Sequence, residues 1–334
     1  MVFDNVRPAV PESVPAPRPP MPTTDVSVII PTHNRANILG RALDAVLAAL
    51  DAAAFSAEIL VVDDGSDDGT PDLLEALRRS WPGLVVLTQP NRGQAVARNL
   101  AFSRATGRLF VLLGDDIVPE PGFFTSHWEA FTACDRPETF AAIGHTDWHP
   151  EVARTPFREW SNDCGLQFGY GLIAGRADLD FRFFYTSNLS FSRALYDRCG
   201  GFDERFREYG WEDVELGFRY QAAGMSLRYL PAAQARHLHP LTLRDFCARR
   251  IATGRSAVVC QALHPELAGV LGVRQVGRWW GLAPSLLTPI TTVLTALDLR
   301  GIDVNLPARA VLRAHYLAGL LEGQRVARRG KSGP

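Results

Sequence analysis

The stretch ILVVDDGSDDGT at residues 59–70 decides the fold, because a β-branched strand runs directly into paired aspartates and a glycine turn. The same pattern recurs at residues 109–116, where an apolar strand ends in Gly114-Asp115-Asp116. The spacing of apolar residues around these stretches predicts strands at 26–30 and 84–88, and helices at 37–50, 71–79 and 93–105. Strands that alternate with helices predict an α/β fold, with a Rossmann-like, mostly parallel sheet flanked by helices.

Composition limits what the chain can do. Its 334 residues are 46% apolar, enough for a large core with appendages. The 35 basic and 36 acidic residues leave a net charge of -1, so we expect no nucleic-acid partner. The five cysteines are scattered without a C-x-x-C pair, which argues against disulfides and structural zinc and favours a reducing compartment.

Acidic side chains follow two of the predicted strands. Asp63 and Asp64 end one strand, and Asp115 and Asp116 end another. Because ligands gather at the carboxyl ends of parallel strands, we expect both pairs to lie at the binding edge of the sheet. A divalent cation with oxygen ligands would relieve the repulsion within such a pair and bridge phosphate oxygens. Each pair taken alone is equally consistent with a solvated turn.

A third acidic pair opens a predicted helix. Glu212 and Asp213 follow Trp211, at a position where acids also act as simple caps that favour the helix dipole. The functional interpretation makes Asp213 a general base and offers the flat face of Trp211 to a sugar ring.

Three basic or imidazole side chains are further candidates. His237 and His239 alternate after a predicted strand at 226–230, so one of them would face the site, although a lone histidine is more often structural. Arg98 lies on the helix that would face bound phosphates, and it also fits an ordinary surface position.

The order of seven motifs is more specific than any one of them. Together they resemble family 2 glycosyltransferases of the GT-A fold, over about residues 26–240. The motifs are VSVIIPTHNR (26–35), ILVVDDGSDDGT (59–70), NRGQAVARN (91–99), LLGDDIVP (112–119), SNLSFSR (187–193), GGFDERF (200–206) and GWEDVELGFR (210–219). The chain departs from the family's frequent D-x-D at the metal site, since it reads G-D-D, and we expect retained metal binding with an altered donor contact.

The resemblance implies an inverting hexosyltransferase-type enzyme that depends on a nucleotide-diphosphate sugar and on Mn²⁺ or Mg²⁺. It implies that Asp213 is the catalytic base, that Asp116 and His237 hold the metal, and that Trp211 and Glu212 bind acceptor or sugar. Whether His237 or His239 meets the metal stays open. Residues implied in donor binding are Pro31, Thr32, Asn34, Arg35, Asp64, Arg98 and Asp115, with Asp64 accepting from a uracil-like ring N–H.

The resemblance also divides the chain. We expect a disordered proline-rich leader at 1–24, a GT-A domain at 25–240 and a helical C-terminal extension at 241–334. The GT-A domain splits into a nucleotide-binding half at 25–120 and an acceptor-binding half at 121–240. The second half contains a weakly periodic segment at 147–185 that we expect to face the acceptor.

The expected reaction moves a sugar from a nucleotide-diphosphate donor, UDP before dTDP, to an acceptor hydroxyl in bacterial polysaccharide, glycolipid or other glycoconjugate assembly. The acceptor is a saccharide, a lipid-linked molecule or another hydroxyl compound. One alternative is a nucleotidyltransferase that makes the sugar nucleotide, but a Gly-rich phosphate loop is missing after the first strand, where residues 31–35 read PTHNR. The other is a non-catalytic nucleotide- or sugar-binding module.

We expect a cytoplasmic protein, with a peripheral place on the inner face of the membrane as its alternative. The basic helical extension with its paired tryptophans could rest on an anionic membrane, but a solvated helical face is the favoured interpretation. Residues 281–297 are the nearest to a membrane span, yet Pro284 and Pro289 interrupt them, so we expect helices packed on the protein itself.

Overall fold

The computed structural model describes residues 23–331 except 82, 177 and 274–275. The leader predicted at residues 1–24 therefore lies almost entirely outside the described residues. The chain forms two compact units that interleave along the sequence. The first comprises Met1–Val152, Ile173–Glu204 and Asp213–His239, and the second comprises Ala153–Leu172, Arg205–Glu212 and Pro240–Pro334. The predicted boundaries at residues 120 and 240 stay predictions.

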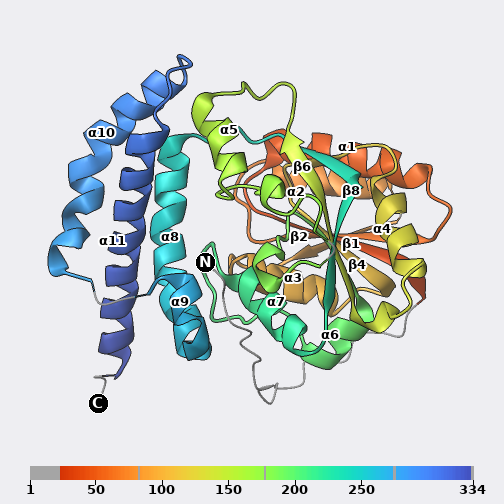
Figure 1. The fold of residues 1–334 in the computed structure, drawn as a ribbon. Helices are drawn as coiled ribbons and strands as arrows, with labels where there is room; N and C mark the ends of the chain where they lie inside the picture. The colour runs from red at the N-terminus through yellow and green to blue at the C-terminus, as the bar shows by residue number, and fades with distance from the viewer. Residues whose placement is uncertain (1–22, 82, 177, 274–275, 332–334) are drawn as a thin grey trace. The chain divides into compact units, whose positions relative to one another are not determined.

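The first unit is built on one eight-stranded sheet with the order β3-β2-β1-β4-β7-β6-β8-β5 (Figure 1). The strands β3, β2, β1 and β4 run parallel, β7 is antiparallel to β4 and β6, and β5 is antiparallel to β8. Their bounds are β1 Thr24–Thr32, β2 Ala57–Asp63, β3 Leu84–Thr88, β4 Gly107–Leu113, β5 Ile117–Pro119, β6 Phe140–Trp148, β7 Asn188–Ser192 and β8 Ser226–His237. The parallel half agrees with the sequence prediction, whereas β5 was not predicted.

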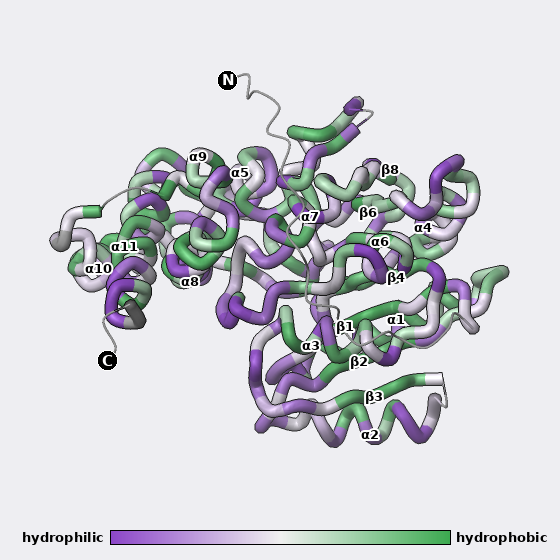
Figure 2. The backbone as a smooth tube through the Cα atoms, turned by 90° about the horizontal axis from the view of Figure 1, so that it is seen from below, coloured by the Kyte–Doolittle hydropathy of each residue, from purple (hydrophilic) through white to green (hydrophobic). Residues whose placement is uncertain are grey.

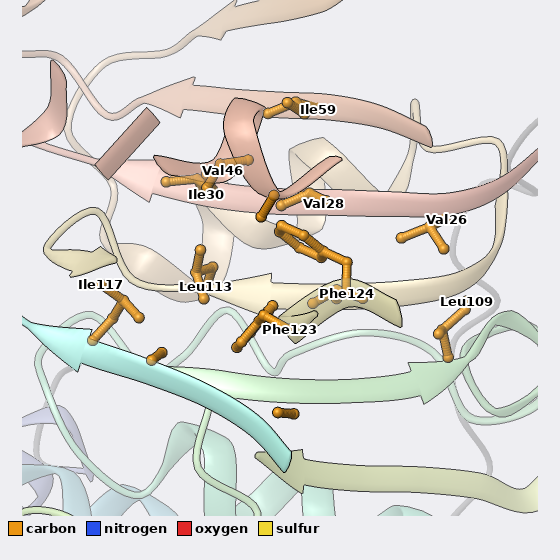
Figure 3. Close-up of a cluster of buried hydrophobic side chains, with 14 of the residues drawn as sticks. Val26, Val28, Ile30, Val46, Ile59, Leu109, Leu113, Ile117, Phe123 and Phe124 are labelled. Carbon is orange, nitrogen blue, oxygen red and sulfur yellow. The ribbon is translucent and has the colours of Figure 1, made fainter. Parts of the chain in front are cut away.

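Helices cover both faces of this sheet. Alternate residues of β1 and β4, such as Val28 and Val111, pack under α1 and α4 in one core cluster, where Phe123 and Phe124 are buried (Figure 3). On the opposite face Phe110 stacks on Phe102 of α3, at 5.4 Å between ring centroids. The helices of this unit are α1 Ala36–Asp51, α2 Thr70–Ser80, α3 Gln94–Phe102, α4 Phe123–Thr132, α6 Arg193–Cys199 and α7 Glu212–Ala222, with short 3-10 turns at Pro137–Thr139 and Phe181–Phe183.

The sheet order fixes where a ligand can bind. The strand β1 pairs with β2 on one side and with β4 on the other, so the connections leave in opposite directions at β1. Open α/β sheets bind ligands at the carboxyl ends of strands at such a switch point. Thr32 ends β1 there, directly paired with Asp63 at the end of β2.

The second unit is helical. Its helices are α5 Pro156–Asp163, α8 Leu243–Leu263, α9 Ala268–Leu271, α10 Ala283–Asp298 and α11 Asn305–Lys331, with 3-10 turns at Tyr170–Leu172, Pro265–Leu267 and Arg278–Leu282 (η5). The helix α5 lies within the segment that the sequence left without periodicity. It begins at the N-cap Thr155, whose side chain accepts from the Arg158 N–H.

The helix α10 packs on the protein along one side only. Residues 281–297 were expected to pack on the protein, and Ala283, Thr291 and Asp298 are buried there against the neighbouring helices. The rest of the helix is open, since only 11% of an 18-residue window within Trp279–Asp298 is buried. By length and composition alone, this is the one helix in the described ranges that could cross a membrane.

Candidate active site

Asp115 follows the end of β4 and lies against Thr32, the last residue of β1, and Arg35 in the loop after it. The Thr32 hydroxyl donates a hydrogen bond of 2.8 Å to Asp115 Oδ2, and Arg35 Nε lies 3.9 Å from Asp115 Oδ1. Burial, followed by repulsion from Asp116, raises the pKa of Asp115 to about 7, although Arg35 and Thr32 act in the opposite direction. Asp115 is therefore a carboxyl group whose charge needs a further positive partner.

Asp116 lies beside His237, with 3.5 Å between Asp116 Oδ2 and His237 Nε2. The two residues come together because β5 pairs with β8 and the Leu238 N–H donates to the Asp116 carbonyl. The His237 ring meets the edge of Trp148, at 5.2 Å between centroids. The ring of His239 lies 6.4 Å from the His237 ring, between centroids, and its Nδ1 lies 3.3 Å from Arg35 Nη1. Of the two histidines, His237 is thus the one that adjoins Asp116.

A divalent cation fits these groups only in part. Among the described residues no group of three or more His, Cys, Asp and Glu side chains could hold a metal ion. Asp116 and His237 offer one oxygen and one nitrogen ligand, next to a second carboxyl group whose charge is penalised. Cations such as Mg²⁺ are often bound by one or two carboxylates together with substrate phosphates and water. Asp116 and His237 therefore fit a cation whose remaining ligands come from a bound diphosphate and water.

Asp64 is held by the loop that precedes α3. Its Oδ1 accepts from the Gln89 side chain at 2.7 Å and from the Arg92 N–H at 2.8 Å, and its Oδ2 accepts from the Gly93 N–H at 2.8 Å. Asp64 therefore satisfies backbone donors at the start of α3, a function that sequence reasoning missed. The polar residues after β3 could have indicated this contact, because β3 and β2 are parallel and end at the same edge of the sheet. The expected contact of Asp64 with a nucleobase stays a prediction.

Asn34 fastens the loop after β1 to the loop after β2. Its backbone N–H donates to Ser66 Oγ and its Oδ1 accepts from the Asp67 N–H, each at 2.9 Å. Asn34 has a φ of 53°, a left-handed conformation that asparagine tolerates better than most residues. Pro31 pairs with Val62 inside the sheet. These residues shape the edge around Thr32 rather than present free polar groups to it.

Asp213 lies in the first turn of α7, and its carboxylate interacts with the charge of Arg98 in α3. Burial raises the pKa of Asp213, while the Val214 N–H, which donates at 2.8 Å, and the positive charge of Arg98 lower it. Arg98 is buried, donates to Gln94 Oε1 at 3.2 Å and lies over the Phe202 ring at 5.4 Å. The pair consists of a carboxylate that binds a proton more readily than usual and a nearby fixed cation.

Trp211 and Glu212 belong to the second unit. The Trp211 indole N–H donates to the Thr253 carbonyl of α8 at 3.0 Å, and Glu212 Oε2 accepts from the Gly210 N–H at 2.8 Å. Trp211 has a φ of 72°, which is strained for a bulky side chain. Strain of this kind persists where surrounding contacts hold it, and it often marks functional segments.

Family models match most of the chain. A model described as Glycosyl transferase family 2 matches residues 27–198, just over half of the chain, and one described as Glycosyl transferase family group 2 matches residues 125–319. The chain is 30% identical over 259 residues to Pre-mycofactocin glycosyltransferase of Mycobacterium tuberculosis H37Rv. This match covers 75% of this chain and 51% of that protein.

A second curated relative is Validoxylamine A glucosyltransferase of Streptomyces hygroscopicus subsp. jinggangensis, 30% identical over 223 residues, which are 60% of this chain and 52% of that protein. The chain spans about half the length of these curated relatives. Among solved structures, mannosyltransferase PcManGT from Pyrobaculum calidifontis, in complex with GDP-Man and Mn²⁺, matches with a TM-score of 0.59 and 22% identity. The match covers 91% of this chain and 89% of that one, and it supports the predicted GT-A fold.

Proposed function

Because this chain belongs to glycosyltransferase family 2, we propose that it is a nucleotide-sugar glycosyltransferase that inverts the anomeric carbon in a single metal-assisted displacement. The proposed donor is a UDP-sugar, with a dTDP-sugar next. The proposed acceptor is a hydroxyl group of a saccharide, a lipid-linked molecule or another small compound. The names of the two relatives, a pre-mycofactocin and a validoxylamine A transferase, keep small acceptors among the candidates.

One observation carries the proposal. Asp115 and Asp116 lie at the switch point of the sheet, beside Thr32 and Arg35 on one side and His237 on the other. A buried like-charge pair is costly unless a cation or an opposite charge compensates it, and this pair has only part of that compensation. A cation bound at Asp116 and His237 would neutralise the negative charge that develops on a leaving diphosphate.

The residues of the chain supply the other steps of the proposed mechanism. Asp115 and Thr32 orient the donor, and Arg35 holds negative charge at the same edge. Asp213 accepts the proton of the acceptor hydroxyl while that oxygen attacks the anomeric carbon. The bond to the nucleoside diphosphate breaks on the opposite face, so the configuration inverts. The raised pKa of Asp213 supports its role, because a stronger base retains the proton as the new bond forms.

Calorimetric titration with UDP, dTDP, GDP and CDP, with and without Mn²⁺, tests the proposal. We expect one pyrimidine diphosphate to bind tightly with Mn²⁺ and weakly without it, and Asp116→Ala to abolish that difference. Slow metal-dependent hydrolysis of the cognate sugar nucleotide separates a transferase from a binding module. Release of pyrophosphate from a sugar phosphate and a nucleoside triphosphate would instead identify a nucleotidyltransferase.

A further inference from the structure

The second unit exposes one continuous apolar stripe. Trp279, Leu282, Leu286, Ile290 and Val293 are 48–69% exposed and recur every three or four residues along η5 and α10. Leu299, Ile302 and Leu306 extend the exposed apolar surface beyond α10, so this segment holds eight of the twelve large apolar side chains that are exposed in the described part of the chain. The sequence of α10 has no charged residue before its last residue, Asp298.

The other side of α10 is held by the protein. Ala283, Thr291 and Asp298 are buried there, and α11 lies between α10 and α8 (Figures 1 and 2). Asp298 accepts from the Thr155 hydroxyl at 2.6 Å and from the Phe157 N–H at 2.8 Å. A helix that left the protein to span a bilayer would have to abandon these bonds. The geometry therefore suits a helix that lies on a membrane rather than one that crosses it.

Positive charges border the stripe. Arg300 is exposed just after α10, and the guanidinium of Arg325 lies against Gly281 at the start of η5 and α10. From Arg300 to Lys331 the sequence has seven basic and two acidic residues, a balance of +5. Among residues 279–329, all of which the structure describes, Asp303 is the one exposed acidic residue. An anionic lipid surface complements this arrangement, whereas a symmetric contact with a second copy would bring the same arginines together.

We infer that α10 is an interfacial anchor, which lies in the headgroup region of an anionic bilayer with its apolar stripe towards the acyl chains. The stacked pair Trp279 and Trp280, at 3.9 Å between ring centroids, sits at one end of the stripe, and tryptophan is enriched at the membrane–water interface. The inference uses no residue of the candidate active site, so it stands or falls independently of the proposed reaction.

Co-sedimentation of the full chain with lipid vesicles tests the anchor. We expect binding to phosphatidylglycerol–phosphatidylcholine vesicles that weakens in high salt, and weaker binding to pure phosphatidylcholine vesicles. Leu286→Glu and Val293→Glu should each lower the partition coefficient roughly tenfold, because each removes an apolar contact with the lipid acyl chains and inserts a charge there. Arg325→Gln should lower binding to the anionic vesicles about fivefold and leave binding to the neutral vesicles unchanged.

Val270→Glu is the matched control, since Val270 is an exposed apolar residue (39%) of the same unit but lies outside the stripe. It should bind vesicles as the wild type does, and circular dichroism should show all variants folded. Equal binding of Leu286→Glu and wild type, or no vesicle binding at low salt, would overturn the inference. Three further results would also overturn it: a dimer that Leu286→Glu dissociates in the absence of vesicle binding, equal affinity for both lipids, or resistance of the bound protein to carbonate extraction.

Discussion

The indole N–H of Trp211 donates a 3.0 Å hydrogen bond to the Thr253 carbonyl in α8. The neighbouring residues are tied to the same unit, since Arg255 bridges Glu208 at 2.6 Å and Glu322 at 2.8 Å. Gly210 has a φ of 105° and lies directly on Thr253, where a Cβ would come within 3.0 Å of its hydroxyl. The segment 205–211 is therefore fastened to α8 immediately before the proposed base, Asp213.

The first prediction concerns this attachment. Trp211→Phe removes the indole N–H and leaves the Thr253 carbonyl without this donor, so the free energy of unfolding should fall by about 1 kcal/mol. If the segment positions Asp213, kcat should fall by up to about 10²-fold, the size of a positioning effect. The KM for the donor should stay within about twofold. Urea denaturation and steady-state kinetics measure the two effects. Trp81→Phe, at the end of α2, is the control, and an unchanged kcat in Trp211→Phe would exclude the positioning role.

The second prediction concerns the proposed base itself. Asp213→Asn should lower kcat by on the order of 10²–10⁴, because the amide cannot take up the acceptor proton. The affinity for the nucleotide should stay unchanged, since the variant keeps the side-chain size. Single-turnover kinetics and calorimetry measure the two quantities, and an Asn variant with wild-type kcat would remove Asp213 from the mechanism.

The third prediction is a pH dependence. Asp213 must be deprotonated to act, so activity should rise with pH through its pKa, and burial places this acid limb above the range of an ordinary aspartate. The Arg98 charge lowers that pKa, so Arg98→Met should move the acid limb to still higher pH. The pH profile of kcat at saturating donor measures this shift, because kcat at saturation does not depend on the affinity for the nucleotide. A limb that stays in place would show that the charge of Arg98 does not act on the base.

The fourth prediction concerns the metal. Asp116→Asn should abolish the Mn²⁺ dependence of nucleotide binding, and His237→Ala should weaken it, because the two side chains lie 3.5 Å apart. Asp116→Asn should also raise the Tm of the metal-free protein, since it removes repulsion between Asp115 and Asp116. His239→Ala is the matched control, because His239 lies at Arg35 instead. Calorimetry and thermal unfolding record these effects, and equal losses in both histidine variants would contradict the assignment.

The fifth prediction concerns Asp64. Asp64→Ala leaves the Arg92 and Gly93 N–H groups without their acceptor, so it should cost roughly 2–4 kcal/mol in the free energy of unfolding. Asp64→Asn should cost less, because its amide oxygen can still accept one of these bonds. Urea denaturation distinguishes the two variants, and a fully stable Asp64→Ala protein would show that the loop before α3 is held by other contacts.

The sequence by itself was enough for the parallel half of the sheet. Strands β1 to β4 and helices α1 to α3 follow from β-branched runs and helical periodicity, which are local properties of the chain. The edge that bears Asp64, Asp115 and Asp116 follows as well, because the carboxyl ends of parallel strands meet at one side of a sheet. The ordered motifs were sufficient to indicate the family.

Only the tertiary structure decided what these residues touch. His237 rather than His239 adjoins Asp116, because β5 pairs with β8. This pairing joins Asp116 and His237 although they lie more than a hundred positions apart in the chain. The carboxylate of Asp64 meets the start of α3 across 29 positions of the chain, and the indole of Trp211 meets α8 across 42 positions. The open face of α10 depends on which side of the helix α11 covers, and that choice is made by a contact between separate helices rather than by the local sequence of α10.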